Sequence, residues 1–357
     1  MKIVTVVGAR PQFIKAAPVS RALAQAGIGE CLLHTGQHYD REMSDVFFEE
    51  LGLRAPDLNL NVGSSSHAEQ TAAMLVGIER AILEQKPDWV LIYGDTNSTL
   101  AGAVAAAKLH VPVAHVEAGL RSFNRRMPEE INRVVADALS SLLFVPTETA
   151  RKNLQHEGVP DDRIVRTGDV MLDVTLMFRE VALSRSRILE RLGIREKSYV
   201  LATVHRAENT DDPARLQAIL AGLTQVGREL PVVFPVHPRT RKTIQALGFS
   251  TDGIRLIEPV GFLDMMRLEM GAEVIATDSG GVQKEAFFHR VPCVTLREET
   301  EWVESVELGW NRLCPPKDVQ TIVHHMQAAR GANGASEQPY GNGRAAEHIA
   351  NALLGRR

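Results

Sequence analysis

Short apolar runs alternate with longer segments of helical spacing along the first part of the chain. The apolar runs predict strands at Ile3–Val7, Glu30–His34, Trp89–Tyr93, Val111–Val116 and Leu142–Val145. Between them, helical spacing predicts a helix that begins near Pro11 and helices at Glu42–Leu51, His67–Gln85, Ser98–Leu109, Glu129–Ser140 and Thr147–His156. Uninterrupted apolar strands separated by helices are typical of a parallel sheet covered on both faces.

The same rhythm begins again after a segment at Gly168–Asp173, which we interpret as the division between two halves. Further strands are predicted at Tyr199–Thr203, Val232–Val236, Ile254–Ile257, Val274–Ala276 and Cys293–Leu296, with a helix at Pro213–Glu229. A polar, glycine-rich linker then precedes a last helix, Arg344–Leu354. We predict an α/β protein of two doubly wound, Rossmann-like lobes, residues 1–170 and 171–343. Residues 344–357 are expected to pack on the first lobe. Ligands are expected at the carboxyl ends of the strands and in a cleft between the lobes.

Composition narrows the class of protein. A chain of 357 residues fits about two domains, and 44% apolar and 24% charged residues are ordinary for a globular protein. The net charge of −4 provides no basic field for nucleic acid or an anionic membrane, and no apolar run is long enough to span a bilayer. The chain opens on a strand rather than a signal peptide. Cys31, Cys293 and Cys314 form no C-x-x-C pair, which predicts reduced thiols in a cytoplasmic protein and no zinc site.

The stretch T-D-S-G-G-V-Q-K-E, Thr277–Glu285, predicts a strand, a tight turn and a helix. Free N–H groups at such a helix start suit a phosphate, and Gly280 and Gly281 allow an oxyanion close to the backbone. Glu285, about one turn into the helix, could accept hydrogen bonds from a ribose diol. The alternative is an ordinary turn in which Ser279 caps the helix.

The first turn of the chain, G-A-R-P-Q-F-I-K, places Arg10 after a strand and Lys15 one helical turn later. It matches neither the dinucleotide-binding fingerprint nor a P-loop. The two cations could neutralise a diphosphate, or they could be ordinary solvated side chains.

Carboxylates gather at other predicted strand ends of the first half. Asp95 follows the strand Trp89–Tyr93, although an Asp or Thr there could instead cap the next helix. Strand alternation sends His115 and Glu117 to one face. Glu129 beside Asp95 and Glu117 would form a rim of three acids able to move protons. For the adjacent Glu130, stabilisation by a helix N-terminus is an equal alternative.

Basic residues end two strands of the second half. His205 and Arg206 follow Tyr199–Thr203, and His237 and Arg239 follow Val232–Val236. We predict a positive rim that binds an anionic substrate. No set of His, Cys and carboxylate residues has convincing metal-ligand spacing.

Taken together and in this order, several motifs resemble the non-hydrolysing UDP-N-acetylglucosamine 2-epimerases. They are G-A-R-P-Q-F-I-K at Gly8–Lys15, Y-G-D-T-N-S-T at Tyr93–Thr99, H-V-E-A-G-L-R-S at His115–Ser122, P-E-E-I-N-R at Pro128–Arg133, H-R-A-E-N at His205–Asn209 and T-D-S-G-G-V-Q-K-E at Thr277–Glu285. The resemblance covers nearly the whole chain.

The resemblance implies the two-lobed GT-B fold with UDP bound in the cleft, and a cytoplasmic homodimer that serves polysaccharide biosynthesis. It implies conversion of UDP-N-acetylglucosamine to UDP-N-acetylmannosamine by anti elimination of UDP and re-addition, without metal, nicotinamide or flavin. The catalytic residues carried over are Asp95, Glu117, Glu129 and His205. The residues carried over or predicted for substrate and UDP binding are Arg10, Lys15, His237, Ser279, Gly280, Gly281 and Glu285.

Some residues depart from the pattern of the plain N-acetylglucosamine enzymes. Ala9 and Gln12 replace Thr and Glu, Ala207 replaces Arg, Lys284 replaces Glu, and Glu301-Trp302 stands where many members have Glu-Arg-Pro. These features resemble a branch that acts on UDP-2,3-diacetamido-2,3-dideoxyglucuronic acid, which we keep as an alternative substrate.

Other functions also fit parts of the sequence. A GT-B glycosyltransferase, a hydrolysing epimerase and a non-catalytic nucleotide-sugar sensor are the competing interpretations. Gln37-His38, with Gln70, resembles an allosteric UDP-sugar site of some bacterial members.

Overall fold

A computed structural model describes residues 1–36, 52–236, 238–249 and 252–356. It contains two compact units, Met1–Leu176 with Gln338–Arg357, and Met177–Glu337. The first boundary falls inside helix α7 (Val170–Arg185), whereas the sequence places it after residue 170, where that helix begins. The chain returns to the first unit at Gln338, before its last helix, α16 (Ala345–Leu354).

The first unit is built on a parallel sheet whose described strands run in the order β3-β2-β1-β4-β5-β6-β7. These strands are β1 (Lys2–Val7), β2 (Gly29–His34), β3 (Leu58–Asn59), β4 (Trp89–Tyr93), β5 (Val113–Val116), β6 (Leu142–Val145) and β7 (Ile164–Arg166). The described helices, besides α7 and α16, are α1 (Arg10–Gln25), α3 (His67–Gln85), α4 (Asn97–Lys108), α5 (Pro128–Leu139) and α6 (Glu148–His156). The helix predicted at Glu42–Leu51 lies outside the described residues.

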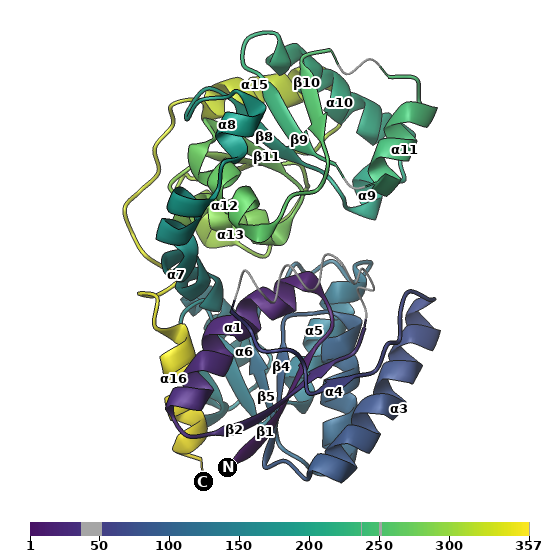
Figure 1. Ribbon diagram of the computed structural model, residues 1–357, viewed down its shortest axis with the longest axis vertical. Helices are drawn as coiled ribbons and strands as arrows, with labels where there is room; N and C mark the ends of the chain where they lie inside the picture. The colour runs from purple at the N-terminus through teal and green to yellow at the C-terminus, as the bar shows by residue number, and fades with distance from the viewer. Residues whose placement is uncertain (37–51, 237, 250–251, 357) are drawn as a thin grey trace. The chain divides into compact units, whose positions relative to one another are not determined.

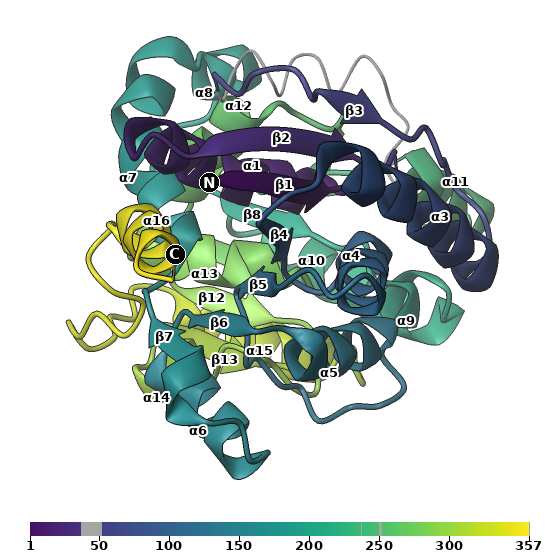
Figure 2. The same ribbon diagram turned by 90° about the horizontal axis from the view of Figure 1, so that it is seen from below.

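Helices cover both faces of this sheet (Figures 1 and 2). On one face α4 packs between α3 and α5, and on the other α1 lies beside α16. Helix α16 buries an apolar stripe that includes Ile349 and Leu353. The last helix therefore completes the core of the first unit, although more than 150 residues separate it from that unit's other elements.

The second unit has a parallel sheet whose described strands run in the order β10-β9-β8-β11-β12-β13. The strands are β8 (Val200–Thr203), β9 (Val232–Pro235), β10 (Ile254–Ile257), β11 (Val274–Thr277), β12 (Cys293–Thr295) and β13 (Asn311–Leu313). The described helices are α8 (Ile188–Leu192), α9 (Ala207–Thr210), α10 (Pro213–Gly227), α11 (Pro238–Ala246), α12 (Phe262–Gly271), α13 (Gly280–Phe288), α14 (Val303–Glu307) and α15 (Val319–Ala329).

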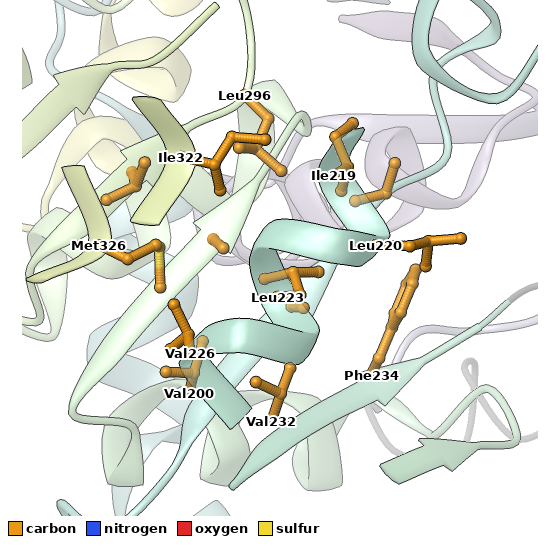
Figure 3. Close-up of a cluster of buried hydrophobic side chains, with 14 of the residues drawn as sticks. Val200, Ile219, Leu220, Leu223, Val226, Val232, Phe234, Leu296, Ile322 and Met326 are labelled. Atoms are coloured by element: carbon orange, nitrogen blue, oxygen red, sulfur yellow. The ribbon is translucent and has the colours of Figure 1, made fainter. Parts of the chain in front are cut away.

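Strand alternation divides the core of this unit into two clusters. Val200 and Ala202 face a cluster formed with α10 and α15, while Leu201 faces a second cluster formed with α8, α12 and α13. Figure 3 shows the first cluster, in which Leu223 and Ile322 lie over the strand side chains. Both faces are thus apolar, which explains the uninterrupted apolar runs in the sequence.

Each sheet changes direction at one place. In the first unit β1 lies between β2 and β4, and in the second β8 lies between β9 and β11. The connections leave to opposite sides there, so the loops at the carboxyl ends diverge and leave room for a ligand. The motifs Gly8–Lys15 and Tyr93–Thr99 follow β1 and β4, and the motifs His205–Asn209 and Thr277–Glu285 follow β8 and β11. The fold class predicted from the sequence, two doubly wound α/β units, is confirmed.

Two further observations concern membrane-spanning helices and cysteines. Over the described ranges, no helix combines the length and apolarity needed to cross a bilayer. Cys31, Cys293 and Cys314 are all buried, and none is in a disulfide.

Candidate active-site residues

Gln12 fixes the first turn of the chain. Its side-chain oxygen accepts hydrogen bonds from the backbone N–H groups of Gly8 and Ala9, at 2.8 and 3.0 Å. Its amide nitrogen donates to the carbonyl of Tyr93 at 2.8 Å and to the Thr99 hydroxyl at 3.0 Å. An ionised Glu could not make these last two bonds, because it has no proton to donate. Gln12 is therefore a buried link between the ends of β1 and β4.

Lys15 and Glu117 form a buried ion pair beside the end of β4. Their side chains are only 11% and 8% exposed. A Cβ atom added to Gly94 would lie 3.4 Å from Lys15 Nζ and 4.0 Å from Glu117 Oε2. Gly94 has a φ of +61°, a left-handed conformation that also favours glycine at this position. Arg10, half-buried, begins the helix that carries Lys15. The cation at position 15 is therefore not an ordinary solvated lysine.

Asp95, the residue after Gly94, pairs with Arg133 on α5. Its side chain remains 32% exposed. The Asn132 amide donates to the Asp95 carbonyl at 2.9 Å. The cap of α4 is Thr96, whose hydroxyl accepts from the Thr99 N–H. Capping thus does not account for Asp95, whose carboxylate is held at the surface by an arginine.

Glu129 and Glu130 occupy the first turn of α5 in opposite surroundings. Glu130 is buried and accepts hydrogen bonds from the N–H groups of Ser122 and Phe123, both at 3.0 Å, and from Arg133 at 2.8 Å. It has a structural task that goes beyond the helix dipole. Glu129 is half-buried, and no hydrogen bond or ion pair joins it to another described residue. It is the acid of this pair that is open to a substrate.

The expectation that His115 and Glu117 share a face of one strand is wrong. Strand β5 ends at Val116, and Glu117 adopts a left-handed φ of +70°, so alternation does not extend to it. The His115 ring instead lies fully buried between the carbonyl of Gly94 and the carboxylate of Asp137. The contacts of Lys15, Glu117 and Asp95 meet around Gly94, and Arg133 connects Asp95 to the turn that holds Glu129.

In the second unit Asp278 organises the turn after β8. Its fully buried carboxylate accepts hydrogen bonds from the backbone N–H groups of His205 and Arg206 and from the Asn209 amide, at 3.0–3.1 Å. Arg206 Nε donates to the Asp278 carbonyl at 2.9 Å. In the sequence, Asp278 is identifiable only as part of the tight turn in the motif Thr277–Glu285. Its partners lie about 70 residues away in the chain, so no local pattern could identify them.

The N-terminus of α13 is open. Ser279 stands at the cap position, yet its side chain makes no capping hydrogen bond, so simple capping does not explain the motif. Neither Gly280 nor Gly281 has a positive φ, and an added Cβ would meet nothing closer than 3.4 Å. The fold itself therefore does not require these glycines, whereas close approach of an oxyanion to the backbone would.

Several side chains border this helix start. A Cβ on Gly280 would lie 3.4 Å from Trp302 Nε1 and 4.0 Å from a terminal guanidinium nitrogen of Arg206. A Cβ on Gly281 would lie 3.8 Å from Glu285 Oε2, so the Glu285 carboxylate turns back toward the first turn. Donors and one carboxylate thus surround the same backbone, a pattern suited to a phosphate with an attached diol.

The structure describes some of the remaining predicted site residues and not others. The His205 side chain is 56% exposed, with Nδ1 3.3 Å from Asp278. His237 and Gln37-His38 lie outside the described residues, as does the side chain of Arg239. Gln70 is occupied internally, since it donates to the Gly63 carbonyl at 2.8 Å and accepts from Asn97 at 2.9 Å. No group of three or more potential metal ligands occurs within the part of the chain that the structure describes.

Comparison with known proteins gives one consistent family. The family model for UDP-N-acetylglucosamine 2-epimerase matches residues 21–354. A UDP-2,3-diacetamido-2,3-dideoxy-D-glucuronate 2-epimerase of Pseudomonas aeruginosa is 50% identical, over 99% of this chain and 99% of that protein. A UDP-N-acetylglucosamine 2-epimerase of Methanocaldococcus jannaschii is 43% identical, again over 99% of each chain.

Solved structures agree with the sequence comparison. The crystal structure of the M. jannaschii UDP-GlcNAc 2-epimerase in complex with UDP-GlcNAc and UDP superposes with a TM-score of 0.94 at 43% identity, over 99% of this chain and 100% of that one. Proteins this similar over their full length share fold and family. The chain therefore belongs to the UDP-N-acetylglucosamine 2-epimerase family, and it is an isomerase with the two Rossmann-like units of the GT-B fold.

Proposed function

We propose that this protein is a non-hydrolysing UDP-N-acetylglucosamine 2-epimerase that interconverts UDP-N-acetylglucosamine and UDP-N-acetylmannosamine. The observation that carries the proposal is the cluster around Gly94, where Lys15, Glu117 and Asp95 meet at the switch point of the first sheet. A proton bound to carbon is weakly acidic, so its removal needs a positioned base, and carboxylates supply one. Departure of UDP needs donors and positive charge on the phosphates.

The second unit would hold UDP. The open N–H groups of α13, the hydroxyl of Ser279 and the Arg206 guanidinium would bind the diphosphate. Gly280 and Gly281 would allow it to approach the backbone. Glu285 would accept hydrogen bonds from the ribose hydroxyls. His205 is exposed beside the same turn and would assist departure and return of UDP.

The reaction would run in two steps, elimination of UDP and its re-addition. A carboxylate of the first unit takes the proton from C2, the C1–O bond to UDP breaks with its electron pair on UDP, and a C1–C2 double bond forms. A second acid then returns a proton to C2 on the opposite face, and UDP adds back at C1. Because the proton leaves C2 on one face of the sugar ring and returns on the other, acids are needed on both sides of the ring. Asp95, Glu117 and Glu129 would supply them, together with the cations Lys15 and Arg10.

The alternative substrate is the uronate UDP-2,3-diacetamido-2,3-dideoxyglucuronic acid, which the name of the P. aeruginosa relative contains. Two residues that depart from the pattern of the N-acetylglucosamine enzymes, Gln12 and Lys284, bear on this alternative in different ways. The buried Gln12 side chain hydrogen-bonds to backbone groups and to Thr99, so its replacement of Glu gives no information about substrate charge. Lys284 stacks on Trp302, with Nζ 3.9 Å from the ring centroid, and keeps a cation close to the helix start.

A substrate panel followed by NMR tests the proposal. Purified protein would be mixed with UDP-N-acetylglucosamine, UDP-N-acetylmannosamine and the diacetamido uronate, without an acceptor. We expect the neutral pair to interconvert to one equilibrium mixture from either side. Conversion of the uronate alone would select the alternative, and loss of UDP with C2 unchanged would indicate a hydrolase or transferase.

Three broader features belong to the same proposal. We propose a homodimer, and its support is a set of large apolar side chains on α3 and α5 that are 37–56% exposed: Val76, Leu83, Ile131 and Leu139. We also propose a cytoplasmic enzyme, consistent with three buried cysteines outside any disulfide. Its product would be a precursor for polysaccharide biosynthesis.

A further inference from the structure

A buried network of charged side chains lies behind the Gly94 cluster. Asp137 on α5 is the centre of this network, and His115 and Arg121 both contact its carboxylate at 2.7 Å. Arg121 also reaches Glu157 at 2.6 and 2.7 Å. The side chains of His115, Asp137 and Arg121 are at most 2% exposed. Burying ionisable groups costs desolvation energy that even good pairing can fail to recover, so the network needs an explanation beyond packing.

Both ring nitrogens of His115 face an oxygen. Nε2 lies 2.7 Å from the carbonyl oxygen of Gly94, which can only accept. Nδ1 lies 2.7 Å from Asp137 Oδ1. Burial raises the pKa of Asp137, but hydrogen bonds from His115 and Arg121 outweigh it and hold this pKa below its ordinary value. Asp137 is therefore ionised, with Oδ1 against the His115 ring and Oδ2 accepting from Arg121.

The same network holds two loops. Through His115 it fixes the carbonyl of Gly94, the residue before Asp95. Through its other oxygen, Asp137 accepts from the Gly119 N–H at 3.1 Å, two residues after Glu117. Gly119 has a φ of +78°, and a Cβ there would lie 2.4 Å from the Ala150 carbonyl, so this loop has little freedom.

Backbone bonds join the two loops to each other and to the sheet. The Gly94 N–H donates to Val116, and the N–H groups of Glu117 and Ala118 both donate to Phe144. The left-handed conformation of Glu117 is maintained between these anchors. The backbone that carries the two acids is thus tied down on both sides.

We propose that His115 and Asp137 are positioning residues of the reaction, which together fix the Gly94–Asp95 turn relative to the Glu117–Gly119 loop. The proposal rests on the function proposed above. Neither residue touches the substrate in this account. They act by holding the carboxylates of Asp95 and Glu117 at one separation, and a misplacement of about 1 Å at a reacting group costs about 100-fold in rate.

Two substitutions at position 115 separate the two contacts. His115→Asn keeps a donor near the Nδ1 position, facing Asp137, and loses the contact with Gly94. His115→Gln reaches the Nε2 position and keeps the donor to Gly94. Glu157→Gln is the control, because Glu157 closes the far end of the network and its side chain is 40% exposed. Each full-length variant would be assayed for kcat, KM, UDP affinity by calorimetry and thermal midpoint.

We expect His115→Asn to lower kcat by about 10- to 100-fold, with KM and UDP affinity changed less than about threefold. His115→Gln should keep most of the activity, and Glu157→Gln should affect only the thermal midpoint. Unchanged kcat in His115→Asn would overturn the proposal. So would losses of kcat that follow the thermal midpoint equally in all three variants, since that is what a merely structural role predicts.

An NMR measurement on the unmodified protein gives a test that is independent of activity and of variant folding. With labelled histidine, His115 Nε2 should carry a proton that is hydrogen-bonded to Gly94, and an unprotonated Nε2 would contradict the proposal. In His115→Asn the amide signals of Asp95 and Gly119 should both shift. If the wild type inverts no UDP-sugar, the proposed function fails, but these signals still decide whether His115 positions the loops.

Discussion

At the scale of single residues, adjacent positions in the chain can have opposite tasks. Glu129 and Glu130 differ by one step along α5, yet one is open and the other is enclosed by Ser122, Phe123 and Arg133. The resemblance singles out Glu129, but the motif does not show what holds Glu130. The difference arises because Glu130 binds the loop at Ser122 and Phe123. The periodic pattern of the sequence does not reveal this contact.

This difference gives a matched pair of substitutions. Glu129→Gln should lower kcat by about 10²- to 10⁴-fold, the range for loss of a proton-transfer group, while the free energy of unfolding changes by no more than about 0.5 kcal/mol. Glu130→Gln should cost about 1–3 kcal/mol of stability, because buried donors lose a charged acceptor. Steady-state kinetics and urea unfolding check both. Similar stability losses in the two variants would refute the assignment.

Asp137 makes a second residue-scale prediction, through pH. Because the pKa of Asp137 in the folded protein lies below the ordinary aspartate value of 3.8, its ionised form stabilises the fold above that pH. This stabilisation should be lost as the pH falls below 3.8 and through the folded pKa. Asp137→Asn should be less stable than wild type at pH 7, and the difference should shrink on acidification. Thermal midpoints measured from pH 7 down to about 3 test this, and a constant difference would contradict it.

At the scale of elements, strands and helices with an apolar pattern could be predicted, and three short strands without one could not. The bounds predicted for α3, β4 and β6 agree with the structure because each has a full apolar pattern. Strands β3, β7 and β13 have two or three residues and contain polar positions, so their sequences carry no period. The expected shared face of His115 and Glu117 failed for a related reason, since a left-handed residue ended the strand first.

A substitution at the N-terminus of helix α13 tests whether this helix start binds UDP. Gly280→Ala should weaken UDP binding at least about tenfold, because a methyl group would occupy the space of a phosphate oxygen. The fold should not suffer, because a Cβ at position 280 would meet no atom closer than 3.4 Å. Calorimetry with UDP and thermal unfolding are the measurements. Unchanged UDP affinity would remove α13 from the site.

A glycine elsewhere in the same unit serves as the control. A Cβ on Gly222, in α10, would lie 2.7 Å from the Ile322 side chain within the core. Gly222→Ala should therefore destabilise the second unit by about 1–3 kcal/mol through overpacking and leave UDP affinity of the folded protein unchanged. The two glycine variants should thus show opposite patterns.

At the scale of the whole molecule, the chain is divided differently from what local composition suggests. The sequence predicts the division between the halves at Gly168–Asp173, but from Val170 this segment forms the start of α7, and the two units divide only at Leu176. Asp173 accepts hydrogen bonds from the N–H groups of Ala345 and Ala346, at 3.1 and 2.8 Å. The first unit is therefore closed by a helix from the end of the chain.

This organisation predicts that a substitution near the end of the chain destabilises the first unit and not the second. Ile349→Ala, in α16, should destabilise the first unit by about 2–5 kcal/mol, because Ile349 is fully buried. Hydrogen exchange should rise in α1 and β1 while α10 and β9 keep their protection. Equal increases in both units would show that they unfold as one body.

Motifs and resemblance supplied the candidate acids and the phosphate turn, but not the side chains that hold them. Asp278, Asp137 and Gln12 act on partners that are distant in sequence, and only the folded chain brings them together. The most direct test of the central claim is proton exchange at C2. In heavy water with UDP-N-acetylglucosamine, the account predicts deuterium at C2 of the recovered substrate and of the epimer formed. Epimer formed without deuterium, or no incorporation with any UDP-acetamido sugar, would contradict it.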